Sequence, residues 1–381
     1  MTTEGTRMAL ISAHTAATDV ASVVTDLASQ LSVSDDPSFI VVFCGHDLDG
    51  TAVAAGLVGH LPTARVVSCS SAGEFTERAH SRGGAAAVAF PRSVAATVAT
   101  ALVDVSGGVS EGVSSAVEAL ESQLGASLRG LDPNRHVGLV LIDGLAGHEE
   151  EINQALGRAA PFLSFVGGSA GDDLRFERTW VATDWAGPSQ GAVLAVLELT
   201  TPFTVLKTCS FEPSARSYTV TKADLASRTV HQLDGRPVLE VYAEAVGGSP
   251  AELGTSVFMA HPFGVMIDGL SWIRSPQQIT SDGGLKFYCR LPEGTRIHLM
   301  DPTDLVADTA SALSQAREQL NGHIGGGLLF NCILRRLELD ATNRHDEFLR
   351  VFDGIPLAGL HTYGESWLGH INQTCTGLLI G

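Results

Sequence analysis

Apolar positions along the chain gather in short runs that recur in a fixed order with helical segments and glycine turns. Three runs of β-forming residues open the pattern, at 39–44, 137–142 and 327–332. Segments with helical spacing follow them, at 50–60, 148–160 and 344–352. After each glycine turn comes another apolar run of small residues, at 84–90, 191–199 and 376–380. The order strand, helix, strand, turn, strand therefore occurs three times.

Each turn combines small residues with a carboxylate. The turns read Ser70-Ser71-Ala72-Gly73-Glu74, Gly168-Ser169-Ala170-Gly171-Asp172 and Tyr363-Gly364-Glu365. From Val42, Val140 and Phe330 to the turn glycine is 31, 31 and 34 positions. Glycine lets another backbone or a ligand approach closely, while the acid either caps backbone N–H groups or is offered to a ligand. We expect the three glycines to be equivalent, and at least two of Glu74, Asp172 and Glu365 to face one cavity.

Apolar runs that alternate with helical patterns predict an α/β fold of layered sheets, built from repeated strand–helix–strand–turn–strand units. Residues 16–31 and 305–320 also show helical spacing. Between the second and third repeats, residues 201–300 predict a strand-rich insert with one helix at 238–246. Its candidate strands are 204–211, 218–223, 229–233, 256–259, 285–289 and 297–300. We predict a helical lead-in over 1–34, an N-terminal domain over 35–200 and a C-terminal domain over 201–381.

Composition narrows the class of protein. The 381 residues are 44% hydrophobic and 17% charged, which is typical of a globular chain. The formal net charge of −18 disfavours binding to nucleic acid or to anionic membrane surfaces. No apolar run approaches the roughly 20 residues that span a bilayer. The six cysteines show no zinc spacing and no secretory signal opens the chain, so the sequence predicts a cytoplasmic protein with free thiols.

The motifs, taken in their order, resemble those of the FIST family. These are bacterial sensory proteins with an N-terminal and a C-terminal FIST domain. Phe165–Asp172 is similar to the N-terminal signature, and the C-terminal signature is matched by Leu329–Arg335 and Tyr363–Glu365. The resemblance covers roughly residues 35 to 381. The chain departs from the family pattern at Ile371, which follows His370, and no inherited role is assigned to His370.

The resemblance implies a small-ligand sensor that passes its binding signal to a separate signalling partner, such as a histidine kinase. No kinase, methyl-acceptor or cyclase segment is evident in the sequence, so we expect the output to pass through that partner. One branch of the family consists of heme proteins that sense nitric oxide. The alternative hypothesis is therefore a nitric oxide sensor with heme b.

Two histidines are candidates for a heme or metal ligand, because histidine is the usual protein ligand of both. His261 lies at the predicted end of an apolar strand, next to Pro262, and His361 lies beside the third turn. The alternative interpretation of each is a core or turn histidine. Further ligand contacts are predicted for Asn331, Cys332, Arg335 and Tyr363. Arg335 and Arg336 are expected to pair with the turn acids or to hold a carboxylate ligand.

We expect the principal pocket to lie between the C-terminal repeat and the strand-rich insert, near His261, Asn331, Cys332, Arg335, His361 and Glu365. Catalysis is the less favoured alternative. It would require Ser71 and the turn acids to meet at working distance. The motifs of serine hydrolases, zinc proteases, phosphate-binding loops and dinucleotide-binding loops are all missing from the sequence.

Overall fold

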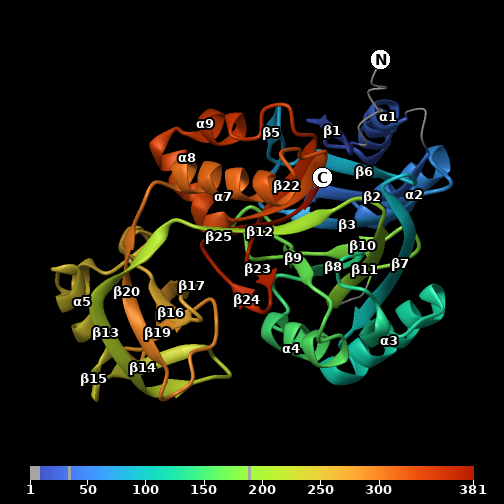
Figure 1. The fold of residues 1–381 in the computed structure, drawn as a ribbon. Helices are drawn as coiled ribbons and strands as arrows, with labels where there is room; N and C mark the ends of the chain where they lie inside the picture. Colours follow the sequence, from blue (N-terminus) through green and yellow to red (C-terminus); the bar gives the residue numbers. More distant parts are fainter. Residues whose placement is uncertain (1–8, 33–35, 188–189) are drawn as a thin grey trace.

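Three sheets surround a shared apolar core, and a fourth sheet lies to one side of them in the computed structural model (Figure 1). The structure describes residues 9–32, 36–187 and 190–381. Each of the three sheets is centred on one repeat of the chain, which we call unit 1 (11–91), unit 2 (95–199) and unit 3 (203–380). The fourth sheet belongs to the insert, residues 211–302, which interrupts unit 3.

All three units share the order strand, helix, strand, helix, strand, short strand, strand, to which units 1 and 3 add a further short strand and unit 3 a further helix. Unit 1 consists of β1 (Ile11–Thr15), α1 (Val20–Leu31), β2 (Pro37–Gly45), α2 (Gly50–His60), β3 (Arg65–Ser71), β4 (Glu74–Thr76), β5 (His80–Ser81) and β6 (Ala85–Pro91). Unit 2 consists of β7 (Ala95–Asp104), α3 (Val109–Leu124), β8 (His136–Ile142), α4 (Glu149–Ala159), β9 (Phe165–Ser169), β10 (Val181–Thr183) and β11 (Gly191–Leu199). Unit 3 consists of β12 (Phe203–Cys209), α7 (Leu305–Gln319), β21 (Gly326–Cys332), α8 (Ile333–Thr342), α9 (His345–Arg350), β22 (Leu357–Thr362), β23 (Glu365–Trp367), β24 (His370–Ile371) and β25 (Thr374–Ile380).

The insert folds as a curled antiparallel sheet with two helices. Its strands are β13 (Phe211–Asp224), β14 (Thr229–Leu233), β15 (Arg236–Pro237), β16 (Phe263–Ile267), β17 (Leu270–Arg274), β18 (Pro276–Ile279), β19 (Leu285–Phe287) and β20 (Arg296–Pro302). The helices are α5 (Val238–Val246) and α6 (Thr255–Ala260). The predicted strand at 256–259 is therefore wrong. This segment forms α6 because Phe258 then points inward, where its ring stacks on that of Tyr242 at 6.0 Å.

The units exchange their short strands. β4 of unit 1 pairs with β22 of unit 3, β10 of unit 2 pairs with β3 of unit 1, and β23 of unit 3 pairs with β9 of unit 2. Within each unit the two strands that flank the second helical segment are parallel, and the last strand runs antiparallel to the first of them. Each sheet thus depends on a strand from another unit, and the exchange closes into a ring.

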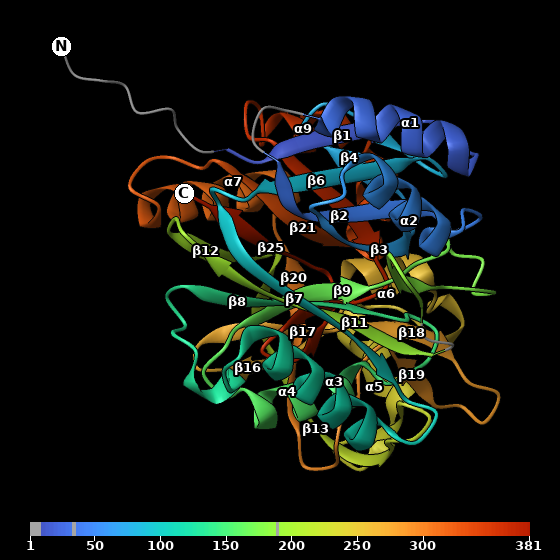
Figure 2. The same cartoon turned by 90° about the vertical axis from the view of Figure 1, so that its right-hand side faces the viewer.

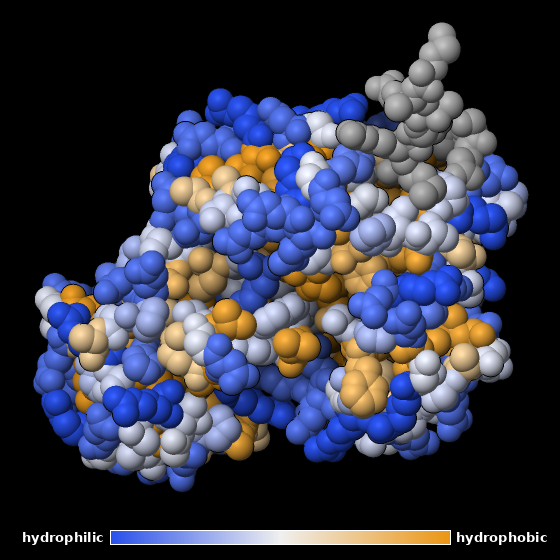
Figure 3. Space-filling view, in the orientation of Figure 1, coloured by the Kyte–Doolittle hydropathy of each residue, from blue (hydrophilic) through white to orange (hydrophobic). Residues whose placement is uncertain are grey.

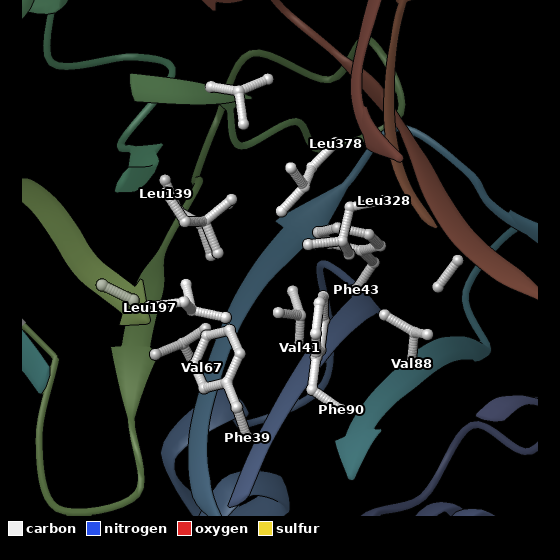
Figure 4. Packing of buried hydrophobic residues seen from close by; sticks show 14 of the residues in the cluster. Phe39, Val41, Phe43, Val67, Val88, Phe90, Leu139, Leu197, Leu328 and Leu378 are labelled. Carbon is white, nitrogen blue, oxygen red and sulfur yellow. The ribbon is translucent and has the colours of Figure 1, made fainter. Parts of the chain in front are cut away.

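Alternating side chains of the central strands supply two cores. In β2, Phe39, Val41 and Phe43 face the core shared by the three sheets, whereas Ile40 and Val42 face α1 and α2. Successive side chains of a strand point to opposite faces, so a run that is apolar at every position is the expected sequence of a strand covered on both faces. The same alternation holds in β8 and β21. Figure 4 shows side chains from different sheets meeting in the shared core.

The helices lie on the outer faces of the three sheets, as Figure 2 shows for α1, α2, α3 and α4. Aspartates begin three of the helices. Asp19 accepts a hydrogen bond from the backbone N–H of Ser22, Asp49 from that of Ala52, and Asp304 from those of Val306 and Ala307. Such caps satisfy N–H groups that have no partner within the helix.

The structure confirms the α/β class and the three repeats. Gly73, Gly171 and Gly364 each follow their parallel strand by two positions, so the predicted equivalence of the glycines is also confirmed. Two features differ from the expectation. β12 pairs with β25 of unit 3, so the insert begins at 211 and not at 201. The predicted helix at 344–352 corresponds to α9, and α8 precedes it without having been predicted. The domain boundaries stay predictions.

The turns of units 1 and 2 are in direct contact, which gives a test of their convergence. A Cβ atom at Gly171 would lie 2.8 Å from both the Cβ and the backbone nitrogen of Ala72. We expect Gly171→Ala to lower the free energy of unfolding by about 1–3 kcal/mol, the usual cost of overpacking. Gly157→Ala in α4 is the matched control, because a Cβ there meets nothing within 4 Å. The control should raise stability by up to about 1 kcal/mol through its helix propensity. Equal effects of the two substitutions in urea unfolding would show that the turns do not pack as described.

Candidate functional site

A cavity of about 700 Å³ lies where the insert meets units 2 and 3. Figure 3 shows one face of the molecule, where polar residues cover much of the surface and some apolar residues lie between the insert and the rest of the chain. Unit 2 contributes Gly144, Leu145, Gly147, Glu149, Leu174 and Phe176 to the lining. The insert contributes Ala226, Ser227, Arg228, Thr255, Gln277, Gln278, Lys286, Phe287, Tyr288 and Arg290, and unit 3 contributes Leu334, Leu337, Tyr363 and His370.

Tyr363 joins the third turn to the loop after the second turn. Its hydroxyl donates a hydrogen bond to the Asp172 carboxylate and accepts one from the backbone N–H of Leu174 at 2.7 Å. The Tyr363 ring also stacks on the exposed ring of Phe176, with centroids 5.2 Å apart. Of the site residues predicted from the sequence, Tyr363 is the one that lines this cavity in the described part of the chain.

Asp172 holds the loop from 173 to 178 in place. Its carboxylate accepts hydrogen bonds from the backbone N–H groups of Phe176, Glu177 and Arg178 at 2.7–3.0 Å. Burial raises the pKa of Asp172, but the bonds from Tyr363 and from the loop outweigh burial, and the net pKa is lowered. Three residues of the loop have positive φ without being glycine, at 54°, 66° and 54° for positions 173, 174 and 176. This conformation is unfavourable for such residues, so the loop depends on the bonds of Asp172.

One wall of the cavity is charged. Arg228 of the insert donates to the carboxylates of Glu149, at 2.7 Å, and Glu150, at the start of α4. Arg290 donates to Glu151 at 2.8 Å. The sequence suggests that these three acids interact favourably with the positive, N-terminal end of the helix dipole. The structure shows in addition that they fasten the insert to unit 2 through two arginines.

His370 lies at the cavity wall and is the one histidine of the lining among the residues that the structure describes. Its side chain is buried, and its Nδ1 atom has no hydrogen-bond partner. Burial lowers the pKa of His370, but the Cys289 sulfur and the carboxylates of Glu149 and Glu150 outweigh it and raise the pKa to about 9. The raised pKa favours the protonated form of His370.

The other two turn acids are enclosed at the start of the exchanged strands. Glu74 accepts hydrogen bonds from the hydroxyls of Ser71 and Ser81 and from the backbone N–H of Gly84, at 2.6–2.8 Å. Burial nevertheless raises the pKa of Glu74. Glu365 accepts from the backbone and the hydroxyl of Thr374 through Oε2, while Oε1 has no partner. Burial raises the pKa of Glu365 to about 8. Neither these acids nor Asp172 line the cavity.

Arg335, Asn331 and His361 form a buried chain of hydrogen bonds within unit 3. The Arg335 Nε donates to Asn331 Oδ1 at 2.8 Å, and Asn331 Nδ2 donates to His361 Nδ1 at 3.1 Å. Arg335 also donates to the hydroxyls of Ser210 and Thr309. Within the described ranges it forms no ion pair with a turn acid. Burial, reinforced by the nearby Arg336, lowers the pKa of His361 well below its ordinary value, so this histidine is neutral.

The neighbouring arginine, Arg336, connects unit 3 to the first two turns. It extends from α8 of unit 3 and donates to the backbone carbonyl of Ala72 in the first turn, at 2.8 Å. It also forms an ion pair with Asp173, directly after the second turn, and a second with Asp340 at 3.4 Å. One buried guanidinium thus contacts the turns of units 1 and 2 from the helix of unit 3.

His261 and Cys332 lie apart from the cavity. His261 ends α6, and its backbone carbonyl accepts a hydrogen bond from the Tyr242 hydroxyl at 2.8 Å. Cys332 is buried at the end of β21, and burial raises the pKa of its thiol well above the ordinary value. No group of three metal-ligating side chains occurs among the residues that the structure describes. In the same part of the chain, no helix has the length and apolar character to cross a membrane.

Sequence reasoning missed the charged residues of the cavity. Arg228, Lys286 and Arg290 lie in strand-rich parts of the insert that carry no motif, so no local signal marks them. A usable signal is present in Glu149–Glu151, because a run of three adjacent acids indicates ion pairs as well as helix capping.

The role of the Tyr363 hydroxyl gives the first test of the site. Tyr363→Phe removes the bonds to Asp172 and to the Leu174 N–H, so we expect a loss of about 1–2 kcal/mol in the free energy of unfolding. Amide hydrogen exchange should increase within residues 173–178. Tyr218→Phe is the control, because Tyr218 packs edge-on against Phe263 without a hydrogen bond from its hydroxyl in the described structure. Unchanged exchange in the loop would contradict the role given to Tyr363.

Glu365 gives a test based on pH. The folded protein keeps a proton on this group up to about pH 8, whereas the unfolded chain releases it near pH 4.5. The unfolded state therefore binds fewer protons between these values, and the contribution of Glu365 to stability falls as pH rises through this window. We expect Glu365→Gln to gain stability relative to wild type from pH 5 to pH 8. Glu118→Gln on the exposed face of α3 should show no such trend. Parallel pH profiles of the Glu365 variant and wild type would refute the assignment.

Comparison with known proteins gives the family. No curated protein matches the chain. The model of the FIST N domain matches residues 38–236, and that of the FIST C domain matches residues 239–367. The first match ends within the insert, and residues of both matched segments line the cavity. FIST domains sense small ligands in signalling proteins. Because these models together span most of the sequence, the chain belongs to the FIST family.

Proposed function

We propose that this protein is a sensor whose small-molecule ligand binds in the cavity between the insert and units 2 and 3, and whose signal passes to a separate signalling partner. The observation that carries the proposal is the place of the cavity. It has the volume of an ordinary small-molecule site, about 300–1,000 Å³, and lies at a junction between parts of the fold, where such sites are common.

The lining connects the cavity to the centre of the fold. Tyr363 and His370 lie at the two ends of the segment that contains β23. This strand belongs to unit 3 and pairs with β9 in the sheet of unit 2. A ligand that contacts either residue can therefore change the position of the exchanged strand β23. Phe176 and Leu174 lie on the loop that Asp172 holds in an unfavourable conformation. A ligand that binds one arrangement of this loop better than another shifts its population, which gives a histidine kinase or another partner a change to detect.

The alternative proposal is a heme-dependent nitric oxide sensor. Neither His261 nor His361 lines the cavity, and His361 is enclosed with its Nδ1 occupied by Asn331. These two residues therefore do not fit a heme in the conformation described. His370 lines the cavity, but its raised pKa opposes the neutral form that binds iron. The heme hypothesis stays a prediction, and the visible absorption spectrum after heme addition tests it. An intense band near 400 nm that is lost in His261→Ala would favour it, and no band would exclude it.

The cavity itself is tested by blocking it. Ala226 lines the cavity from the insert, and Ala226→Trp would fill part of it. Ala215→Trp places the same ring at another exposed position of the insert, away from the lining, and serves as control. In a thermal-shift screen of a metabolite library, we expect a ligand that raises the Tm of wild type and of the control but not of Ala226→Trp. A ligand that protects all three proteins equally would place the binding site elsewhere.

A further inference from the structure

The cavity gathers cationic side chains in a strongly acidic chain. The sequence carries a formal net charge of −18, and only three of its residues are lysines. The lining contains the cations Arg228, Lys286 and Arg290, and three acids at the start of α4 pair with the two arginines.

The two arginines are already occupied by the acids at the start of α4. Arg228 pairs with Glu149 and Glu150, and Arg290 pairs with Glu151. Lys286 differs, because it forms no hydrogen bond or ion pair with any residue that the structure describes. It lies in the middle of β19 and lines the cavity, half-buried. Among the lysine and arginine side chains of the lining, Lys286 is thus the one without an ion pair in the described part of the chain.

His370 supplies a second, independent observation. Only 5% of its surface is exposed, and its buried Nδ1 atom has no hydrogen-bond partner. A buried polar atom without a partner costs free energy unless another group satisfies it. Because His370 lines the cavity, a ligand atom that accepts a hydrogen bond is the natural partner.

The remaining lining is apolar and partly aromatic. Phe176 stacks on Tyr363, and Leu334 and Leu337 of α8 lie beside them in the lining. Tyr288 adds a further ring from the insert. These side chains offer apolar contact to the body of a ligand, whereas Lys286 and His370 offer charge and hydrogen bonds to one end of it.

We propose that the cavity binds a small organic carboxylate, with its carboxylate held by Lys286 and His370 and its apolar body against Phe176, Tyr363 and Leu337. This inference rests on the proposed function and adds the class of ligand. A single unpaired ammonium group matches the single charge of a carboxylate. A phosphate carries more charge and is usually held by arginine forks, and both arginines of the lining are engaged with carboxylates.

Matched pairs of compounds test the class of ligand. The probes are phenylacetate, indole-3-acetate and octanoate, each compared with its neutral amide, and binding is measured by calorimetry. We expect at least one acid to bind tenfold or more tightly than its amide. Lys286→Met should reduce the affinity for that acid by tenfold or more, whereas Lys286→Arg, which keeps the charge, should retain most of it. Lys222→Met, at an exposed position of β13 outside the lining, is the control and should bind as wild type does.

The outcomes separate this inference from the proposed function. Amides that bind as tightly as acids, or acids that bind Lys286→Met as tightly as wild type, would overturn the carboxylate assignment and leave the cavity as a binding site for other ligands. Failure of every acid to bind the folded protein would also overturn the assignment. The metabolite screen with the Ala226→Trp variant judges the cavity separately, so its failure would count against the proposed function itself.

Discussion

The ring of exchanged strands is the constraint on which the rest of the structure depends. A parallel strand at the edge of a sheet leaves one row of N–H and C=O groups without partners. Each unit leaves its parallel strand in this condition, and the short strand of another unit covers it. No unit completes its own sheet. The three turns that lead into the short strands must therefore meet, and the residues at the meeting point have to be small, as Ala72 and Gly171 are.

The same constraint decides which residues are left for function. The centre is filled by side chains such as Phe43 and Phe330, whose rings pack edge to face at 5.8 Å. The turn acids are enclosed there and are engaged mainly with local N–H and hydroxyl groups. Space for a ligand remains where the insert meets units 2 and 3. Ion pairs of Arg228 and Arg290 hold the insert against unit 2 there. Tyr363 belongs to both places, because it follows the parallel strand of unit 3 and also lines the cavity.

Much of the fold could be predicted from the sequence, because each repeat has its own local pattern of apolar residues and turn glycines. Runs such as 39–44 are apolar at every position, and the turn glycines recur at nearly constant spacing. The exchange of strands could not be predicted, since β4, β10 and β23 have three residues each and their partners lie more than a hundred residues away. The cavity was predicted beside the insert, but of its predicted residues only Tyr363 lines it in the described structure. Lys286 and His370 acquire their importance from the partners they lack, which only the folded arrangement reveals.

The central claim is that the exchanged strands make the three units one cooperative structure. Native-state hydrogen exchange at increasing denaturant concentration tests it most directly, because it reports the opening free energy of individual amides. We predict that the slowest amides of β2, β8 and β21 converge on one opening free energy, equal to that of global unfolding. Opening of one of these strands at a clearly lower free energy, while the other two stay protected, would contradict the account.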